Sequence, residues 1–354
     1  MSLASRLAQY WSLTRKRAAE GHLSVTRQLL EMCALLLISG NGPGLYHLAG
    51  FWRRSVPFRE KCAHLSAGGY RRRLRRLNPP EYRKITQNKL PEKGLLNLLG
   101  FPTPEFVGFL CPQIGRCHDG QPLRDAEDLA RLIRRLADSR LCFKPVEGWG
   151  GKGFELVEIV RDEPMRFRLV RDGRAVDVRT FVSTILSRNK AFGVLIEKYL
   201  EQHPDMAQFN PSSVNTCRVW VARPCDAAAR VLLAYLRIGR AGSPVDNQSS
   251  GGIVAPIDLQ TGAVSAAIDG LPTRAVFPRH PDHGARIEGS VIPSWSEVKA
   301  LAESCLAAIP RLRFAGLDIA VGRAGPIVIE LNAIPDREGA AFVGVPTGPA
   351  LPRT

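Results

Sequence analysis

A glycine-rich segment flanked by lysines is the first part of the sequence that could do chemistry. The residues concerned are Lys144, Gly148, Gly150, Gly151, Lys152 and Gly153. Because glycine allows positive φ angles and close backbone approach, the N–H groups of such a loop can turn onto phosphate oxygens. The segment lies between two strand-like runs, whereas a Walker loop needs Gly-Lys-Ser/Thr and a following helix. Taken alone, the segment is equally compatible with an ordinary hairpin turn.

Oxygen-bearing side chains recur on two strand-like runs near the C-terminus. They are Asp318, Glu330 and Asn332. Because side chains alternate along a strand, Glu330 and Asn332 share a face. Two carboxylates and an amide oxygen are the hard donors that Mg²⁺ prefers when it bridges phosphates. The alternative is that the two acids are surface residues, but an unpaired carboxylate in an apolar run is costly.

Two weaker signals lie between these groups. Glu197, Lys198 and Tyr199 end an apolar run and could present main-chain groups to a flat base, although an ordinary strand end is the simpler interpretation. Arg218, shortly after Asn215, begins another hydrophobic run. A guanidinium in such a place normally needs an anionic partner.

Short apolar runs predict the elements that must position these residues. Strands are expected at 141–146, 154–160, 194–200, 214–222, 231–238, 253–258, 263–268, 315–321 and 326–331. Helical spacing predicts a helix between 124 and 138. Ser294 and Glu297 form a capping box, which predicts a helix from there to about 309. The body of the chain is therefore expected to be α+β, with mainly antiparallel sheet.

Charge divides the 354 residues into two unequal parts. The net charge is +16, yet residues 1–89 alone carry 17 Lys and Arg against 4 Asp and Glu. Residues 1–75 are expected to be mostly helical. Their apolar run at 29–38 is too short to span a bilayer and predicts a buried helix of a small N-terminal region. The alternative is a basic amphipathic helix that lies on an anionic membrane surface.

Composition and cysteine spacing exclude several classes of protein. A hydrophobic fraction of 45% and a charged fraction of 23% exclude collagen-like, disordered and disulfide-scaffold chains. The 8 cysteines form no CxxC pair and fit no zinc pattern, so we interpret them as unpaired thiols of a cytoplasmic protein. Neither a signal peptide nor a nucleic-acid-binding motif is found.

Together these motifs resemble the ATP-grasp superfamily, and more closely the sugar-transfer associated ATP-grasp family, which is related to glutamate-ligase-like proteins. The resemblance covers about residues 78–340. It is carried by the glycine-rich loop, Glu197 followed by Gln202-His203-Pro204, Asn215-Thr216-x-Arg218, Asp246-Asn247 before Gly251-Gly252, Pro293-x-Trp295, and Gly316-x-Asp318 with Glu330-x-Asn332-x-x-Pro335.

The resemblance implies a nucleotide site built from matching positions. Lys89 and Lys144 would contact the nucleotide, residues 148–153 would cover its phosphates, and Glu197 to Tyr199 would line the adenine pocket. Asp318, Glu330 and Asn332 would hold one or two Mg²⁺ ions, with Mn²⁺ as a substitute. Arg218, with Asn215, would face the transferring phosphoryl group, beside Lys144.

The resemblance also implies the domain organisation and the reaction. Residues 1–77 are expected to form the basic helical region and 78–345 the ATP-grasp domain, divided into 78–200 with the loop lid and 201–345 with the metal and acceptor sites. The implied reaction joins a small-molecule or peptide carboxylate to an amine through an acyl phosphate. The alternatives are a kinase-type phosphotransferase on the same fold, or a protein that binds nucleic acid or an anionic surface. The basic N-terminal region replaces the βαβ domain of familiar ligases, so substrate identity stays open, and an anionic partner or peripheral membrane attachment is a further expectation.

Overall fold

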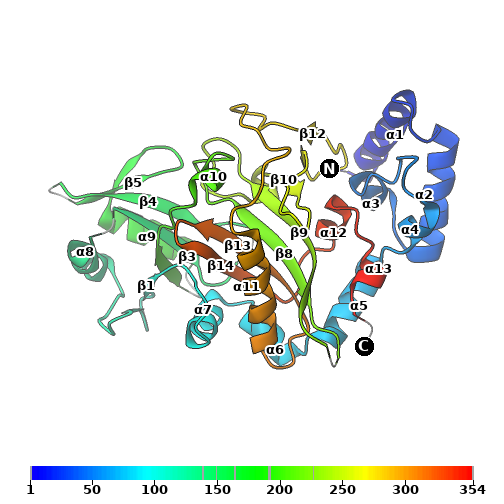
Figure 1. The fold of residues 1–354 in the computed structure, drawn as a ribbon. Coiled ribbons are helices and arrows are strands. Elements are labelled where there is room, and N and C mark those ends of the chain that lie inside the picture. Colours follow the sequence, from blue (N-terminus) through cyan, green and yellow to red (C-terminus); the bar gives the residue numbers. More distant parts are fainter. Residues whose placement is uncertain are drawn as a thin grey trace.

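The computed structural model describes residues 2–137, 139–148, 150–162, 165–189, 193–225 and 227–352. Trp149 of the glycine-rich loop lies outside these residues. Two antiparallel sheets of seven strands each are found in the described residues (Figure 1). The expectation of an α+β body with antiparallel sheets is therefore confirmed.

The first sheet has the strand order β2-β1-β7-β3-β4-β5-β6. Its strands are β1 (Phe106–Leu110), β2 (Arg116–Cys117), β3 (Arg140–Pro145), β4 (Glu155–Val160), β5 (Arg166–Leu169), β6 (Ala175–Asp177) and β7 (Val194–Lys198). Helices α8 (Ala126–Arg135) and α9 (Val178–Arg188) pack against it. Phe143, Phe167 and Phe181 meet edge to face in this core, at centroid distances of 4.8 to 5.8 Å. This core holds the strands on both sides of the glycine-rich loop.

The second sheet has the strand order β12-β11-β10-β9-β8-β13-β14. Its strands are β8 (Thr216–Ala222), β9 (Arg230–Ile238), β10 (Ile253–Pro256), β11 (Ala267–Ile268), β12 (Val276–Phe277), β13 (Phe314–Gly322) and β14 (Gly325–Asn332). Helix α11 (Trp295–Ala308) covers one face and buries Val298, Ala302 and Leu306 against it. The short elements α10 (Pro204–Ala207) and η1 (Gln248–Ser250) lie in the loops around β8 and β9.

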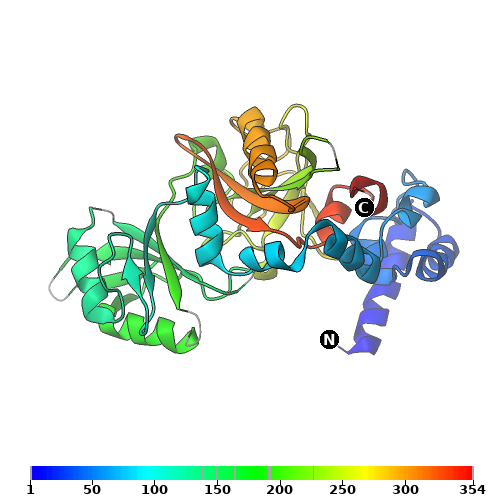
Figure 2. The same cartoon turned by 90° about the horizontal axis from the view of Figure 1, so that it is seen from below.

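Helices at both ends of the chain cover part of the opposite face. Tyr70 and Leu77 of α5 (Ala67–Leu77) pack with Trp220 and Phe314 of the sheet, and Phe342 of α12 (Glu338–Phe342) joins the same cluster. The remaining part of that face turns toward the first sheet. Helices α6 (Pro80–Ile85) and α7 (Lys89–Leu98) connect α5, which packs on the second sheet, to β1 of the first sheet (Figure 2).

The N-terminal helices form a cluster of their own, built around a buried ion pair. They are α1 (Leu3–Ala19), α2 (Val25–Ser39), α3 (Pro43–Leu48) and α4 (Phe58–Cys62). Lys61 lies 2.6 Å from Glu31, which also accepts a hydrogen bond from Tyr46. The C-terminal α13 (Thr347–Ala350) returns to this region, where Thr347 accepts a hydrogen bond from the Leu65 amide at 2.8 Å.

Most predicted strands are present, and two local predictions are wrong. Helix α11 begins after Ser294 as expected, but Ser294 adopts a φ of 50° and makes no side-chain cap bond, so the capping-box mechanism does not operate. The apolar run at 29–38 is not a buried helix throughout. Within it Met32 and Leu35 are buried, whereas Leu30 and Leu37 are exposed. Its one buried stripe is enough to attach α2 to the cluster.

Among the described residues, no helix is long and apolar enough to cross a membrane.

Candidate active site

The second sheet carries a row of charged side chains on the face that α11 leaves open. Asp318 on β13 stands opposite Glu330 on β14 and opposite Arg218 on β8, and Arg218 stands opposite Tyr235 on β9. Directly opposed residues of antiparallel strands point to the same side of the sheet. The sequence predicts only which residues of a single strand share a face. The register between neighbouring strands brings these four side chains into one row.

Two guanidinium groups hold the Asp318 carboxylate. Arg218 donates to both of its oxygens, with Nη2 to Oδ2 at 3.0 Å, and Arg237 Nη1 lies 2.7 Å from Oδ2. Burial by itself would raise the pKa of Asp318, but the two positive charges outweigh that effect and lower it. Asp318 is therefore held ionised at the open face of the sheet. The anionic partner that Arg218 was expected to need is Asp318.

Arg237 was not singled out from the sequence. Like Arg218, it is an arginine inside an apolar run, so it also needs an anionic partner. Its other nitrogen, Nη2, donates to Asp246 at 2.8 Å. Asp246 in turn accepts hydrogen bonds from the backbone N–H and the hydroxyl of Thr216, at 3.1 and 2.5 Å. This chain of contacts ties the loop after β9 to strands β8 and β13.

The first sheet contributes a buried carboxylate between two lysines. Glu197 lies 2.5 Å from Lys144 and also forms an ion pair with Lys93 of α7. Burial would raise the pKa of Glu197, but the charges of Lys144 and Lys93 lower it instead. Lys93 was not singled out in the sequence, because a lysine in an amphipathic helix gives no local sign of burial. The Glu197 side chain is thus engaged by ammonium groups on both sides.

Lys89 joins the glycine-rich loop to Glu330, at the end of the row of side chains on the second sheet. Its Nζ donates to the Gly148 carbonyl at 3.1 Å and lies 3.5 Å from Glu330 Oε1, and its backbone N–H donates to the Val146 carbonyl. Within the loop, Gly151 has a φ of 71°, and a Cβ placed there would lie 2.7 Å from Asn247 Oδ1. Only glycine fits this close approach between the loop and the segment after β9.

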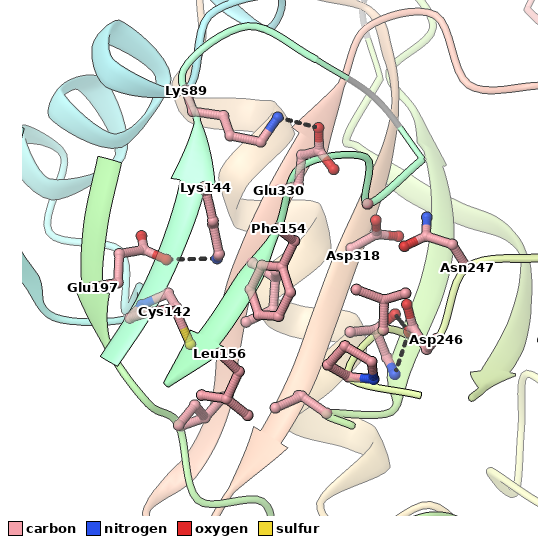
Figure 3. Close-up of a pocket in the computed structure, with 18 of the residues that line it drawn as sticks. Lys89, Cys142, Lys144, Phe154, Leu156, Glu197, Asp246, Asn247, Asp318 and Glu330 are labelled. Carbon is pink, nitrogen blue, oxygen red and sulfur yellow. Dashed lines mark hydrogen bonds and ion pairs between the residues drawn. The ribbon is translucent and has the colours of Figure 1, made fainter. Parts of the chain in front are cut away.

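A cavity lies between the two sheets and is lined by most of the expected residues (Figure 3). The space between its lining residues, including the part that is open to solvent, is about 1010 Å³. The expected lining residues are Lys89, Lys144, Gly148, Gly150, Gly151, Lys152, Glu197, Lys198, Tyr199, Asp318 and Glu330. Cys142, Phe154, Leu156, Leu200 and Ile329 add apolar walls. One end of the cavity is therefore charged, and another part can accept a flat apolar group.

Four expected residues stand apart from the lining of this cavity. The buried Asn215 amide donates to Gln202 Oε1, Met206 O and Asn210 O at 2.9 to 3.0 Å, so it holds the segment before β8 together. Arg218 contacts the site through Asp318, and Asn332 lies diagonally from Asp318, opposite Gly316. Gly153 ends the loop against Pro145, which is 2.8 Å from the position of a Cβ there.

Asp318, Glu330 and Asn332 were expected to hold Mg²⁺, and they carry the kind of oxygen donors that this ion prefers. In the described part of the chain, no three His, Cys, Asp or Glu side chains converge as a metal site by themselves. Asp318 and Glu330 are nevertheless opposed on one face, and Asn332 follows on that same face. An ion held by these three oxygens would complete its coordination with oxygens of a bound phosphate or of water.

Comparison with known proteins identifies the family. The model of the family described as sugar-transfer associated ATP-grasp matches residues 70–352. No curated protein matches the chain. Solved structures with similar folds include N5-carboxyaminoimidazole synthetase from Staphylococcus aureus complexed with ADP, at 14% identity and a TM-score of 0.43 over 77% of this chain and 54% of that one. D-cycloserine synthetase follows at 13% identity and a TM-score of 0.42, over 77% and 72% of the two chains.

The chain spans about half the length of the Staphylococcus aureus enzyme. D-alanyl-alanine synthetase A from Vibrio cholerae is similar at 10% identity and a TM-score of 0.40, over 73% of this chain and 58% of that one. These likenesses are distant, and the family assignment rests on the family model alone. Because that model matches most of the chain, including both sheets and the cavity between them, the protein belongs to the sugar-transfer associated ATP-grasp family and has the ATP-grasp fold.

Proposed function

We propose that this protein is an ATP- and Mg²⁺-dependent ligase that joins a carboxylate to an amine. The observation that carries the proposal is the pairing across one cavity of a lysine-flanked glycine loop with a row of carboxylates. Lys89 spans the two, since its ammonium group contacts both Gly148 and Glu330. The nucleotide-binding part would be the ATP-grasp domain, within residues 78–345.

The distribution of charged and apolar residues in the cavity supports one orientation of the proposed nucleotide. Its triphosphate would lie at the charged end, under the glycine-rich loop, where Lys89 and Lys144 supply positive charge and backbone N–H groups can donate to phosphate oxygens. Its base would lie against Cys142, Leu156 and Leu200, near the main chain of Lys198 and Tyr199. This position corresponds to the usual division of a ligand site into an apolar pocket and a few polar anchors.

Asp318, Glu330 and Asn332 would hold the metal ion, which supplies neutralisation of phosphate charge when it is bound. The protein's own residues would do the remaining work. Arg218 and Arg237 keep Asp318 ionised and fixed in place. Lys144 is oriented by Glu197 at 2.5 Å, so its ammonium group is positioned before substrate arrives. Such preorganised charge is the main requirement of phosphoryl transfer.

The reaction would proceed in two steps without a covalent protein intermediate. A carboxylate oxygen of the first substrate attacks the γ-phosphorus, the bond to the β-phosphate oxygen breaks, and ADP leaves. The amine of the second substrate then attacks the acyl carbon, loses a proton and expels inorganic phosphate. The loop over residues 148–153 would shield the acyl phosphate from water.

The decisive experiment is an ADP-release screen over carboxylates and amines, with product identification by mass spectrometry. An active carboxylate should give a hydroxamate when hydroxylamine replaces the amine, because hydroxylamine intercepts an acyl phosphate. An amide product together with the hydroxamate supports the ligase. A stable phosphate ester, with ADP release that needs no amine, would instead identify a kinase. Lys144→Met is the negative control for both activities.

A further inference from the structure

Helix α2 has an apolar side that the rest of the protein leaves uncovered. Its buried stripe consists of Gln28, Glu31, Met32 and Leu35, at the i, i+3, i+4, i+7 spacing of one helix face. The opposite side carries Leu30, Cys33 and Leu37, one turn apart. Leu30 is 63% exposed and Leu37 is 86% exposed. Exposed apolar side chains gathered on one side of a helix are typical of an interaction site.

Helix α1 carries further exposed apolar side chains. It lies beside α2, and the two are joined by a hydrogen bond from the Gln28 side chain to the Thr14 carbonyl at 3.1 Å (Figure 1). Leu7 and Trp11, one turn apart on α1, are 54% and 48% exposed. For the exposed apolar side chains of the two helices, Leu7, Trp11, Leu30, Cys33 and Leu37, we use the collective name α1–α2 apolar face.

Exposed arginines lie near these side chains on both helices. Arg6 and Arg15 flank Leu7 and Trp11 on α1, and Arg27 precedes Leu30 by three residues; all three arginines are exposed. The acids of the two helices, Glu20 and Glu31, are already engaged. Glu20 lies 2.7 Å from Arg17, and Glu31 accepts from Lys61 and lies 2.9 Å from Arg27. The outward charge of α1 and α2 is therefore positive.

We propose that the α1–α2 apolar face binds the surface of an anionic lipid bilayer. Leucines and a tryptophan would enter the boundary between headgroups and acyl chains, while the flanking arginines would attract the anionic headgroups. Tryptophan is suited to that boundary because its ring is apolar and its N–H is polar. A second copy of the chain is a poorer occupant, because two surfaces of the same positive charge repel one another.

The position of the face leaves the active site free. The N-terminal helices lie at one end of the molecule and the first sheet lies at the other, with the second sheet and the cavity between them (Figure 2). Membrane attachment through α1 and α2 would therefore leave the cavity open to solvent. The proposal is independent of the ligase reaction, and its test requires no knowledge of the substrates.

The test is co-sedimentation of the full chain with vesicles of phosphatidylcholine alone or of phosphatidylcholine mixed with phosphatidylglycerol. Wild type should sediment with the mixed vesicles and not with the neutral ones. Leu30→Ser/Leu37→Ser should weaken partitioning about ten-fold, because two anchoring side chains are lost. The matched control is Leu98→Ser/Ile114→Ser, which removes two side chains of similar exposure, 85% and 66%, outside the N-terminal helices and should bind as wild type does.

A second arm tests the charge, and a third follows the environment of Trp11. Arg6→Gln/Arg15→Gln should lower binding to the mixed vesicles by several-fold and reduce its dependence on salt. Tryptophan emission should shift to the blue with mixed vesicles, and Trp11→Phe should abolish that shift. Absence of wild-type sedimentation, or equal binding by the leucine variant and its control, overturns the proposal. A wild-type dimer that Leu30→Ser/Leu37→Ser dissociates overturns it too, because a second copy would then cover the face.

Discussion

Lys89 and Glu330 contact each other across the cavity, with Nζ and Oε1 3.5 Å apart, although 241 residues separate them in the sequence. Lys89 begins α7, beside the glycine-rich loop, and Glu330 lies on the last strand of the second sheet. The pair therefore connects the phosphate-binding elements with the proposed metal ligands. Because both side chains are partly exposed, replacing one of them should lower activity without unfolding the protein.

Glu330→Gln should reduce ADP formation by about 10²- to 10³-fold, because it removes a charged oxygen from the proposed metal site while keeping the side-chain shape. Glu330 is partly exposed, so the thermal midpoint of unfolding should change little. The control is Glu288→Gln, at an exposed glutamate in the loop between β12 and α11. Turnover by Glu330→Gln equal to that of the control would remove Glu330 from the metal site.

Gly151→Ala should raise the KM for ATP, because a Cβ there would press on Asn247 Oδ1 at 2.7 Å and displace the loop from the phosphates. The alanine also has to adopt a φ of 71°, which costs about 1 kcal/mol. Gly173→Ala separates the two effects, since Gly173 has a φ of 72° with no atom within 4 Å of the added Cβ. Similar ATP kinetics in both variants would show that the close approach of Gly151 to Asn247 does not matter for ATP binding, and the proposed role of the loop would be wrong.

Glu197→Gln should lower the free energy of unfolding by about 3 kcal/mol, because it leaves two buried ammonium groups, those of Lys93 and Lys144, without a counter-charge. Urea denaturation measures the change. Glu201→Gln, which affects only exposed ion pairs with Arg140 and Arg323, should cost less than about 1 kcal/mol. Adding Lys93→Met to Glu197→Gln should restore part of the loss; no restoration would contradict the assigned pairing.

Stability should fall as the pH is lowered from about 6.5 to 4, in part because of His47. Burial, helped by the charge of Arg17, lowers the pKa of His47 to about 4, so the folded state keeps this side chain neutral. The unfolded state binds the proton from about pH 6.5 downward and is favoured increasingly until pH 4, below which this contribution is constant.

The measurement for His47 is the urea midpoint as a function of pH. His47→Gln, which is neutral throughout, should flatten the slope between pH 6.5 and 4. His203→Gln, at a partly exposed histidine in the loop after β7, should leave that slope unchanged. An unaltered slope in His47→Gln would mean that another group controls the acid sensitivity.

The sequence was a good guide to strands with apolar runs bounded by turns, and a poorer guide elsewhere. Strands β3, β4, β7, β8, β9, β13 and β14 lie where the runs predicted them. Helix α9 was missed although Val178, Phe181, Val182 and Ile185 follow helical spacing. Strand β1 was missed because its five residues contain Gly108, which favours turns.

For the candidate site, the sequence determined which residue types lie on which strand face, because alternation is a local property. It indicated Lys144, most of the glycine-rich loop and the pair Asp318 and Glu330, which line the cavity. It did not distinguish Asn215, whose amide is engaged in buried hydrogen bonds, from a residue that faces a ligand. Donor and acceptor capacity is visible in a sequence, but the partners that occupy it are not.

Only the tertiary structure decided how charges are shared between distant segments. Register alone places Arg218 opposite Asp318, and the packing of α7 against the first sheet brings Lys93 to Glu197. The same holds for α2, whose apolar run could be buried or exposed until its neighbours were known. Local pattern depends on a few successive residues, whereas ion pairing and burial depend on which elements meet in space, and that is set by the packing of the whole chain.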